Sequence, residues 1–264
     1  MKDFGILVFG HTRATLLGDL LESIDRQGAI SSVDLWIDGY QGKTELKNRV
    51  HIAQKVGNNY DVGVRRYHHG QLGFRKLMLQ AMQSAVSNYE HILFLEDDCF
   101  PTRNAVSIFR EELSSIENDP ETFSVYGHPF LMAEDSGYCT RFQGWGWATT
   151  ADKLAPYVDR LVECYSMSEQ DYLDFTRAAL TPEILQRLDV TPPRQPSYTL
   201  KTFFAWDETL ALLTAMDAKR HKVTRERVIF NCGMGDGSAH FGEDQKYLNP
   251  PFNIIPHERV WEVF

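Results

Sequence analysis

The most constraining stretch of the sequence is Glu90–Pro101, in which a short, mostly apolar run leads straight into three consecutive carboxylates. The run His91–Leu95 has the length and the lack of polar alternation that are typical of a strand buried on both faces, inside a largely parallel sheet packed between helices. Glu96, Asp97 and Asp98 then lie at its carboxyl end, the edge of such a sheet where ligands bind. Crowded carboxylates repel one another unless a cation or hydrogen-bond donors neutralise them, and a hard divalent ion that holds a diphosphate would do so. The alternative is an acidic turn that is simply solvated.

Size and charge narrow the class of protein. The 264 residues, 43% of them hydrophobic, suffice for one large α/β domain, which we expect to span 1–264. The formal charge of −9 argues against a nucleic-acid partner, because binding to phosphates needs clustered Lys and Arg. No stretch approaches the ~20 apolar residues that cross a bilayer, so we expect at most a peripheral position at a membrane.

The cysteines indicate a reducing compartment. They are Cys99, Cys139, Cys164 and Cys232. Because they lie far apart and form no Cys-x-x-Cys pair, the sequence suggests neither a disulfide framework nor a zinc site. Free thiols in a cytoplasmic protein fit this pattern best, with the inner face of a membrane as a further possible location.

Two more segments of the first half carry candidate site residues. Val33–Ile37 is a predicted strand that ends at Asp38, which either belongs to an Asp-Gly turn or accepts a hydrogen bond from a base or ribose. Gly73–Val86 has the apolar spacing of a helix and carries Arg75 near its start, where a basic side chain either meets a ligand or is solvated. Further strands are predicted at 5–9, 62–67, 123–126 and 223–230, and further helices near 16–24, 106–116, 151–162, 168–187 with a break at Pro182, and 208–219.

The second half offers three candidate regions. Arg141–Ala148 alternates glycines with large aromatics, which suits a backbone pressed against a ligand and makes Trp147 a candidate for packing on a sugar, although Trp in a core is the alternative. Asp207 stands at the start of a predicted helix, where it serves as an N-cap, as a catalytic carboxylate, or as both. Asn231–Gly242 holds four glycines and has the flexibility expected of a lid over a ligand.

Together these segments resemble glycosyltransferases of the GT-A type, and among them most closely N-acetylglucosaminyltransferase I and its bacterial relatives. The resemblance follows the order of the chain over most of its length. The matching motifs are Phe9–Leu20 with its Arg13, Ile37-Asp38-Gly39, Leu95-Glu96-Asp97-Asp98, Phe142-Gln143-Gly144-Trp145-Gly146-Trp147, Ala205-Trp206-Asp207, and Ser238-Ala239-His240-Phe241-Gly242 followed by Asp244-Gln245. The resemblance implies a GT-A fold, an α/β structure with a mixed, mostly parallel sheet flanked by helices. It also implies a nucleotide-binding half, 1–100, and an acceptor and catalytic half, 101–264.

The resemblance also implies roles around a nucleotide-sugar donor. Arg13 and Asp38 would hold the nucleoside, and Asp38 would read the base. Glu96 would face the donor sugar and Asp97 the ribose. Asp98 would be the direct ligand of Mn²⁺ or Mg²⁺.

The remaining roles fall on the second half and on one residue of the first. Asp207 matches the general base of the family. Ser238 lies in a segment that folds over the phosphates of the donor, and His240 would approach the same group or the metal. Arg75 and Trp147 complete the predicted set of cofactor-binding residues, although the helix bearing Arg75 matches only loosely. The membrane anchor and stem of the animal enzymes have no counterpart here, which leaves their Golgi-type acceptor in doubt.

The predicted activity is metal-dependent, inverting transfer of a sugar from a UDP-sugar, with UDP-N-acetylglucosamine suggested by analogy, to a hydroxyl of a glycan or glycolipid acceptor. A nucleotidyltransferase of similar fold is one alternative, but Phe9–Arg13 holds a single glycine and lacks the Gly-rich phosphate loop typical of that class. A second alternative is a sugar-nucleotide-binding module without catalysis, as a subunit of a polysaccharide assembly complex, which would not need both Asp98 and Asp207. The oligomeric state is open, with the aromatic C-terminus as a candidate contact between subunits.

Overall fold

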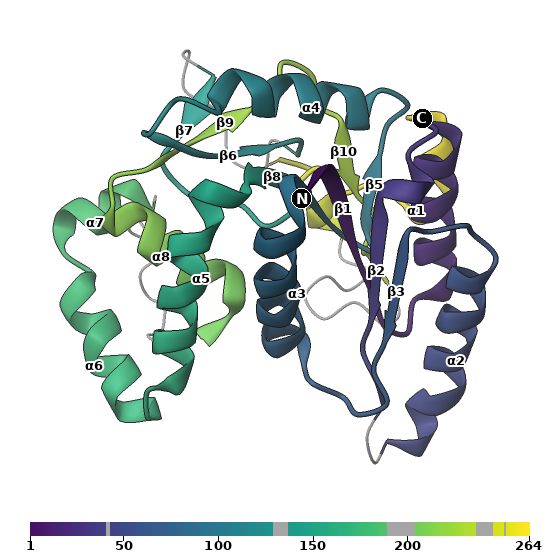
Figure 1. The fold of residues 1–264 in the computed structure, drawn as a ribbon, viewed down its shortest axis with the longest axis horizontal. Coiled ribbons are helices and arrows are strands. Elements are labelled where there is room, and N and C mark those ends of the chain that lie inside the picture. The colour runs from purple at the N-terminus through teal and green to yellow at the C-terminus, as the bar shows by residue number, and fades with distance from the viewer. Residues whose placement is uncertain (41–42, 129–136, 189–203, 236–244, 251) are drawn as a thin grey trace.

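The protein is built around an eight-stranded mixed sheet in the order β3-β2-β1-β4-β8-β6-β9-β7, shown in Figure 1. The computed structural model describes the whole chain except residues 41–42, 129–136, 189–203, 236–244 and 251. The predicted α/β class and the mixed, mostly parallel sheet flanked by helices are confirmed. This sheet takes strands from both predicted halves of the chain, and the expected division at residue 100 falls within β5 (Cys99–Pro101).

The parallel part of the sheet comes from the first hundred residues. The central strand β1 (Lys2–Gly10) pairs in parallel with β2 (Val33–Ile37) on one side and with β4 (Tyr89–Glu96) on the other. The short strand β3 (Val64–Tyr67) extends this sheet beside β2. Apolar residues that point to both faces bury β1 and β2 almost completely, which is why their sequences lack polar alternation.

Antiparallel strands complete the sheet. Strand β8 (Trp147–Thr150) lies antiparallel between β4 and β6 (Thr122–Tyr126), so a strand of the second half pairs directly with the acidic strand. Beyond it, β9 (Arg220–Val223) runs parallel to β6, and β7 (Tyr138–Cys139) pairs antiparallel with β9.

The predicted single strand at 223–230 is wrong, because the chain turns between β9 and β10 (Ile229–Asn231). The hydroxyl of Thr224 donates to the carbonyl oxygen of Glu226 at 2.7 Å and closes this turn. Strand β10 then leaves the main sheet and forms a separate antiparallel ladder with β5. This small ladder starts directly after the acidic turn and therefore shapes the site described below.

Helices cover both faces of the sheet (Figure 1). The core on one face packs α1 (Ala14–Arg26), α2 (Thr44–Asn58) and α4 (Ala105–Ile116), and the core on the other packs α3 (Phe74–Asn88), α5 (Ala151–Ser166) and α8 (Trp206–Met216). Further helices in the described part of the chain are α6 (Glu169–Ala179), α7 (Pro182–Arg187), and 3-10 turns at Ile30–Ser32, Gln245–Leu248 and His257–Glu262. The predicted break at Pro182 is confirmed, since this residue begins α7.

The aromatic residues near the C-terminus pack against their own chain. Trp261 lies 5.2 Å from Phe100 of β5 between ring centroids, and its indole N–H donates to Asp19 of α1 at 2.9 Å. Phe264 contacts the same ring of Phe100 at 6.4 Å. In this structure these rings support β5, and the proposed subunit contact would have to use the 36% of Trp261 that remains exposed.

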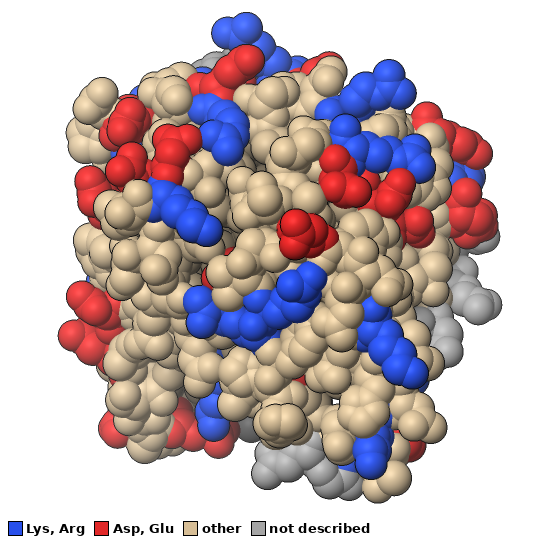
Figure 2. Space-filling model, turned by 45° about the vertical axis from the view of Figure 1, so that its right-hand side comes forward, with Lys and Arg blue, Asp and Glu red and all other residues tan. Residues whose placement is uncertain are grey.

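Two features of the surface bear on the predicted partners. Figure 2 shows one face on which basic and acidic side chains lie close together over much of the surface. The chain as a whole carries a formal charge of −9, so its long-range field is negative and disfavours a nucleic-acid partner. Within the described part of the chain, we find no helix that is both long and apolar enough to pass through a membrane.

Candidate functional site

The predicted acidic turn lies where three adjacent parallel strands end. Phe9 of β1 is in register with Glu96 of β4, and the last residue of β1 is paired with the last residue of β2. Arg13, Asp38 and the Glu96–Asp98 turn therefore follow three neighbouring strands at one edge of the sheet. This arrangement follows from the parallel pairing, which brings the carboxyl ends of the strands together.

Arg13 forms ion pairs with two carboxylates of the turn. It lies in the loop between β1 and α1, and its guanidinium donates to Asp97 and approaches the Oδ2 atom of Asp98 at 2.9 Å. The side chains of Arg13, Asp97 and Asp98 are 18%, 6% and 12% exposed, so the three groups pair within a nearly closed pocket. Burial opposes the charged form of Arg13, but the two carboxylates outweigh it and raise the pKa of the guanidinium.

The site holds more negative charge than Arg13 can neutralise. Burial is the main reason why the pKa of Glu96 lies well above its ordinary value, and the charges of Asp98, Asp207 and Asp97 raise it further. Burial also raises the pKa of Asp97 to about 6, against the opposing effect of Arg13. Glu96, Asp97 and Asp98 thus lie around one guanidinium, and an additional cation would relieve the repulsion among them.

Strand β10 supplies a wall against Asp98. The backbone N–H of Cys232 donates to the carbonyl oxygen of Asp98 at 2.8 Å. At the next residue, Gly233, an added Cβ atom would lie 2.4 Å from Oδ2 of Asp98, so any side chain here would displace the carboxylate. Sequence reasoning missed this contact, for which the only signal was the first glycine of the Asn231–Gly242 loop.

Asp207 reaches the same site from the opposite side of the sheet. The interpretation of Asp207 as an N-cap is wrong, because the cap position of α8 belongs to Ala205 and Asp207 is the second helical residue. An acidic side chain in the first turn still gains from the helix dipole. Its charge raises the pKa of Glu96, and a Cβ atom added to Gly144 would lie 3.4 Å from its Cβ atom. The start of α8 and the end of β4 therefore border one site.

Asp38 organises the loop that leads into α3. Its carboxylate accepts backbone hydrogen bonds from Gly39 at 2.8 Å, from Leu72 at 2.8 Å and from Gly73 at 3.0 Å. Gly73 takes a positive φ of 79°, a conformation that favours glycine. With 5% of Asp38 exposed, these contacts match the turn interpretation, and a contact with a base stays a prediction.

Trp147 does not fit its predicted place beside a sugar. Its ring has no exposed surface and stacks on Phe94 of β4 at 4.3 Å between centroids, with an edge contact to Phe142 at 4.8 Å. The physical reason is the antiparallel pairing of β8 with β4, which directs this side chain into the core beneath α3, α5 and α8. Trp145 is only partly buried and lies against His128 at 5.0 Å.

One further predicted residue lies away from the acidic turn, and two are not among the residues that the structure describes. Arg75, on the first turn of α3, lines a separate cavity together with residues of α5 and α6. Ser238 and His240 lie outside the described residues. The ion pairs bring together Arg13, Asp97 and Asp98, directly after Glu96, and Asp207 affects this group through its charge.

The acidic turn suits a hard divalent cation that a ligand helps to hold. In the described part of the chain, no three His, Cys, Asp or Glu residues form a cluster that could bind a metal by themselves. Mg²⁺ sites commonly use one or two carboxylates and complete the coordination with substrate phosphates and water. The oxygen ligands and the crowding of carboxylates around Asp98 fit a site of this kind, which a protein carboxylate and a bound diphosphate would share.

Comparisons with known proteins identify similar folds only. No protein-family model and no curated protein matches the sequence. A mannosyltransferase from Pyrobaculum calidifontis, solved with GDP-Man and Mn²⁺, is 13% identical, with a TM-score of 0.42 over 81% of this chain and 73% of its own. TarS from S. aureus is 12% identical, with a TM-score of 0.47 over 88% of this chain and 36% of its own. A cytidylyltransferase from Leptospira borgpetersenii serovar Hardjo-bovis is 16% identical, with a TM-score of 0.38 over 59% of this chain and 63% of its own.

The chain therefore spans less than two thirds of both the cytidylyltransferase and TarS. Because these overlaps are loose, the activity has to be inferred from the residues of this chain. The resemblance to N-acetylglucosaminyltransferase I stays a prediction.

Proposed function

We propose that the protein is a metal-dependent, inverting glycosyltransferase that moves a sugar from a UDP-sugar to a hydroxyl of a glycan or glycolipid acceptor. The observation that carries this proposal is the packing of the start of α8 against the acidic strand: Trp206 stacks on Trp147 at 6.2 Å, and Trp147 stacks on Phe94 of β4 at 4.3 Å. In keeping with this packing, the charge of Asp207 raises the pKa of Glu96. This packing means that a carboxylate from the start of α8 borders the same site as the acidic turn after β4, although the two are far apart in the sequence. Group transfer with a general base needs this kind of two-sided acidic site.

On the donor side, Asp98 would hold Mn²⁺ or Mg²⁺ together with oxygens of the diphosphate. When bound, such a cation acts as a Lewis acid and stabilises the charge that develops on a departing diphosphate. Arg13 already pairs with Asp97 and Asp98, and it fixes both carboxylates in position at the strand end. We assign Asp97 to the ribose and Asp38 to the loop beside the nucleoside, where its three backbone contacts hold residues 72–73.

On the acceptor side, Asp207 would take the proton from the hydroxyl that attacks the anomeric carbon. The new C–O bond forms as the bond from the anomeric carbon to the diphosphate breaks, and the proton moves to the carboxylate of Asp207. Attack opposite the leaving group inverts the anomeric centre. Glu96 begins the acidic turn and is affected by the charges of both Asp98 and Asp207, which suits the predicted contact with the donor sugar.

UDP-N-acetylglucosamine is the first donor to test, on the strength of the sequence resemblance. A glycan or glycolipid acceptor and a cytoplasmic site of action, with the inner face of a membrane as the alternative, belong to the same proposal. The loop from Gly10 to Arg13 supports transfer over nucleotidyl transfer, because it holds one glycine and its arginine pairs with the acidic turn.

The test compares three conservative variants of the full chain. Asp98→Asn should abolish Mn²⁺-dependent binding of UDP-sugar in isothermal titration. Asp207→Asn should keep that binding and lower transfer, or slow hydrolysis of the donor, by about 10²- to 10⁴-fold, the usual contribution of a general base. Asp152→Asn is the matched control, because Asp152 is also the second residue of its helix, α5, and is exposed.

Each alternative predicts a different result. Full transfer by Asp207→Asn would refute its assignment as the base. Metal-dependent binding with neither transfer nor hydrolysis would favour a binding module, and release of pyrophosphate from UTP and a sugar phosphate would favour a nucleotidyltransferase.

A further inference from the structure

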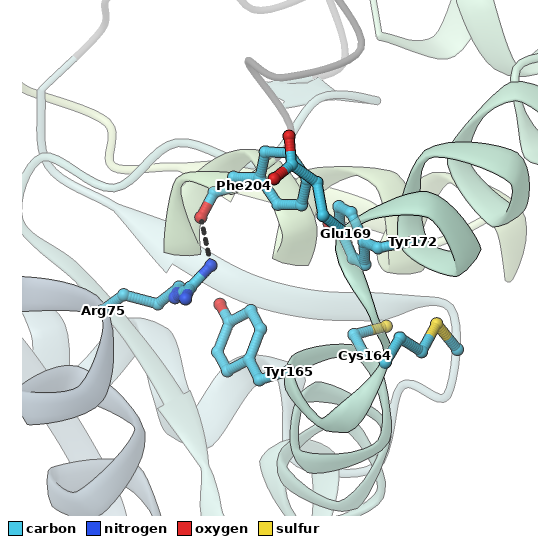
Figure 3. A pocket seen from close by; sticks show the side chains of 7 residues that line it. Arg75, Cys164, Tyr165, Glu169, Tyr172 and Phe204 are labelled. Atoms are coloured by element: carbon cyan, nitrogen blue, oxygen red, sulfur yellow. Dashed lines mark hydrogen bonds between the residues drawn. The ribbon is translucent and has the colours of Figure 1, made fainter.

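A second cavity lies beside the start of α8, away from the acidic turn. It has a volume of about 310 Å³. Residues of α3, α5 and α6 border it together with Phe204, as Figure 3 shows. This volume is at the lower end of the range of about 300–1,000 Å³ found for small-ligand sites. The function proposed above leaves this cavity without a ligand.

Arg75 offers a positive charge to this cavity. Its guanidinium makes a long hydrogen bond of 3.5 Å to the carbonyl oxygen of Phe204, and its guanidinium carbon lies 4.8 Å from the ring centroid of Tyr165. Among the described residues it has no carboxylate partner, whereas Arg141 binds Glu208 at 2.6 Å. A half-buried guanidinium without a carboxylate has most of its five donors free for a ligand.

Tyr165 adds a hydrogen-bonding group at the same place. Its hydroxyl oxygen is buried, lies near the hydroxyl of Thr209, and makes no hydrogen bond of good geometry to the described residues. In Figure 3 this hydroxyl points toward the guanidinium of Arg75, so both groups are directed at the same space. A buried hydroxyl without a partner is costly, and a ligand that accepts its hydrogen bond would remove this cost.

Aromatic rings form the other side of the cavity. Tyr172 and Phe204 stack at 4.7 Å between ring centroids, and the partly buried ring of Phe204 borders the cavity. An aromatic face suits the apolar C–H face of a sugar ring. Glu169 also lines the cavity, at the start of α6.

Residues that line the cavity contact α8, the helix that carries the proposed catalytic carboxylate. The hydroxyl groups of Tyr172 and Thr209 are hydrogen bonded at 2.9 Å, and Thr209 lies two residues after Asp207. Phe204, on the cavity wall, lies three residues before Asp207. A ligand in this cavity would therefore be held close to the first turn of the helix that carries the proposed base.

We infer that this cavity binds an oxyanion-bearing sugar of the acceptor, with the anion on Arg75 and the Tyr165 hydroxyl and the sugar ring beside Phe204. The assignment to the acceptor rests on the proposed function, but the binding chemistry does not. The anion is either the carboxylate of a uronic acid or a phosphate on the sugar, because a guanidinium binds both by paired hydrogen bonds.

The test measures binding of glucuronate, glucose 6-phosphate and neutral methyl glucoside to the full chain by isothermal titration, with and without UDP and Mn²⁺. Both anions should bind more tightly than the glucoside, and the tighter of the two identifies the source of the oxyanion. Arg75→Ala should abolish the preference for anions. Tyr165→Phe keeps the ring and should weaken anion binding by about three- to tenfold, as loss of one hydrogen bond does. Arg110→Ala is the control, because Arg110 also lies over an aromatic ring, at 4.2 Å, but on α4.

Three results would overturn the inference. The neutral glucoside could bind as tightly as the anions, or neither anion could show saturable binding. Alternatively, Arg75→Ala and Tyr165→Phe could bind the anions with the same affinities as wild type. Thermal unfolding of each variant shows whether it is folded, and Tyr165→Phe provides the test if Arg75→Ala is not. Binding of UDP with Mn²⁺ is a separate readout for the proposed function. Loss of UDP binding with retained anion binding would refute the donor chemistry and support the cavity as an anion site. Retained UDP binding with no anion binding would refute only the inference about the cavity.

Discussion

His221 makes the stability of this fold depend on pH in a way that can be calculated. The residue is fully buried in β9, where burial, reinforced by the positive charge of Arg187, lowers the pKa of its imidazole to about 3. In the unfolded chain a histidine titrates near pH 6.5, so below that pH the unfolded state binds a proton that the native state does not. The free energy of unfolding must therefore fall as the pH drops from about 6.5 toward 3.

The expected loss from His221 is about 2.3 kcal/mol between pH 6.5 and pH 4.5, since the slope rises from half of its full value at pH 6.5 to about 1.4 kcal/mol per pH unit below pH 5.5. A double variant, Ser124→Ala with His221→Phe, should remove this loss. The Oγ atom of Ser124 and Nδ1 of His221 are hydrogen bonded at 2.8 Å, so the double change removes both partners together. Replacing both with apolar groups is close to neutral at pH 8, where the imidazole is uncharged in both states.

The assay is urea unfolding of wild type and the double variant at pH 4.5, 5.5, 6.5 and 8, with the difference between the two curves as the readout. His128, whose pKa burial also lowers to about 3, and Asp97, whose pKa burial raises to about 6, are present in both proteins and cancel in this difference. His69→Asn, a change at an exposed residue, is the control and should follow wild type. If the double variant lost as much stability as wild type toward pH 4.5, the assignment of a neutral, buried His221 would be refuted.

Two further predictions concern the acidic turn. Arg13→Met should lower the free energy of unfolding by about 3–5 kcal/mol at pH 7, because it leaves the buried carboxylates of Asp97 and Asp98 without their partner, and urea unfolding would measure it. A loss below about 1 kcal/mol, the value of an exposed ion pair, would contradict this picture. Gly233→Ala should weaken Mn²⁺ binding in the presence of UDP by about 10- to 100-fold, since the new Cβ atom would displace the carboxylate of Asp98. Gly18→Ala is the control, because its added atom would lie 3.5 Å from a Val56 methyl group, and it should bind Mn²⁺ as wild type does. Isothermal titration measures both variants, and equal Mn²⁺ affinities for the two would contradict the proposed contact between Gly233 and Asp98.

The sequence predicted well the elements that depend on local pattern. Val33–Ile37 forms the expected strand with the expected bounds, because a short, mostly apolar run that ends at an Asp-Gly turn is typical of a buried strand. Helix α2 was not predicted, because it buries only Val50, Ala53 and Gly57 and so shows a weak apolar stripe. The break after Val223 depends on a turn whose backbone is tied to Tyr126 of another strand, and no local pattern records that contact.

The same distinction holds for the site. The position of Glu96–Asp98 at the end of a buried strand could be inferred from the neighbouring residues alone. The alternation of Gly and Trp at 144–147 could not tell which face of the sheet Trp147 would occupy, because that depends on pairing with β4. Likewise, the pairing of Arg13 with the turn and the approach of Asp207 come from tertiary packing between segments distant in sequence.

The ladder between β5 and β10 has a consequence for how this protein is made. The ribosome delivers Asp98 long before it delivers Cys232 and Gly233, which form the wall against this carboxylate. A nascent chain or an amino-terminal fragment that stops before β10 would thus expose the acidic turn without its wall. The proposed donor site would then be complete only after synthesis has passed β10 and the two distant segments have met.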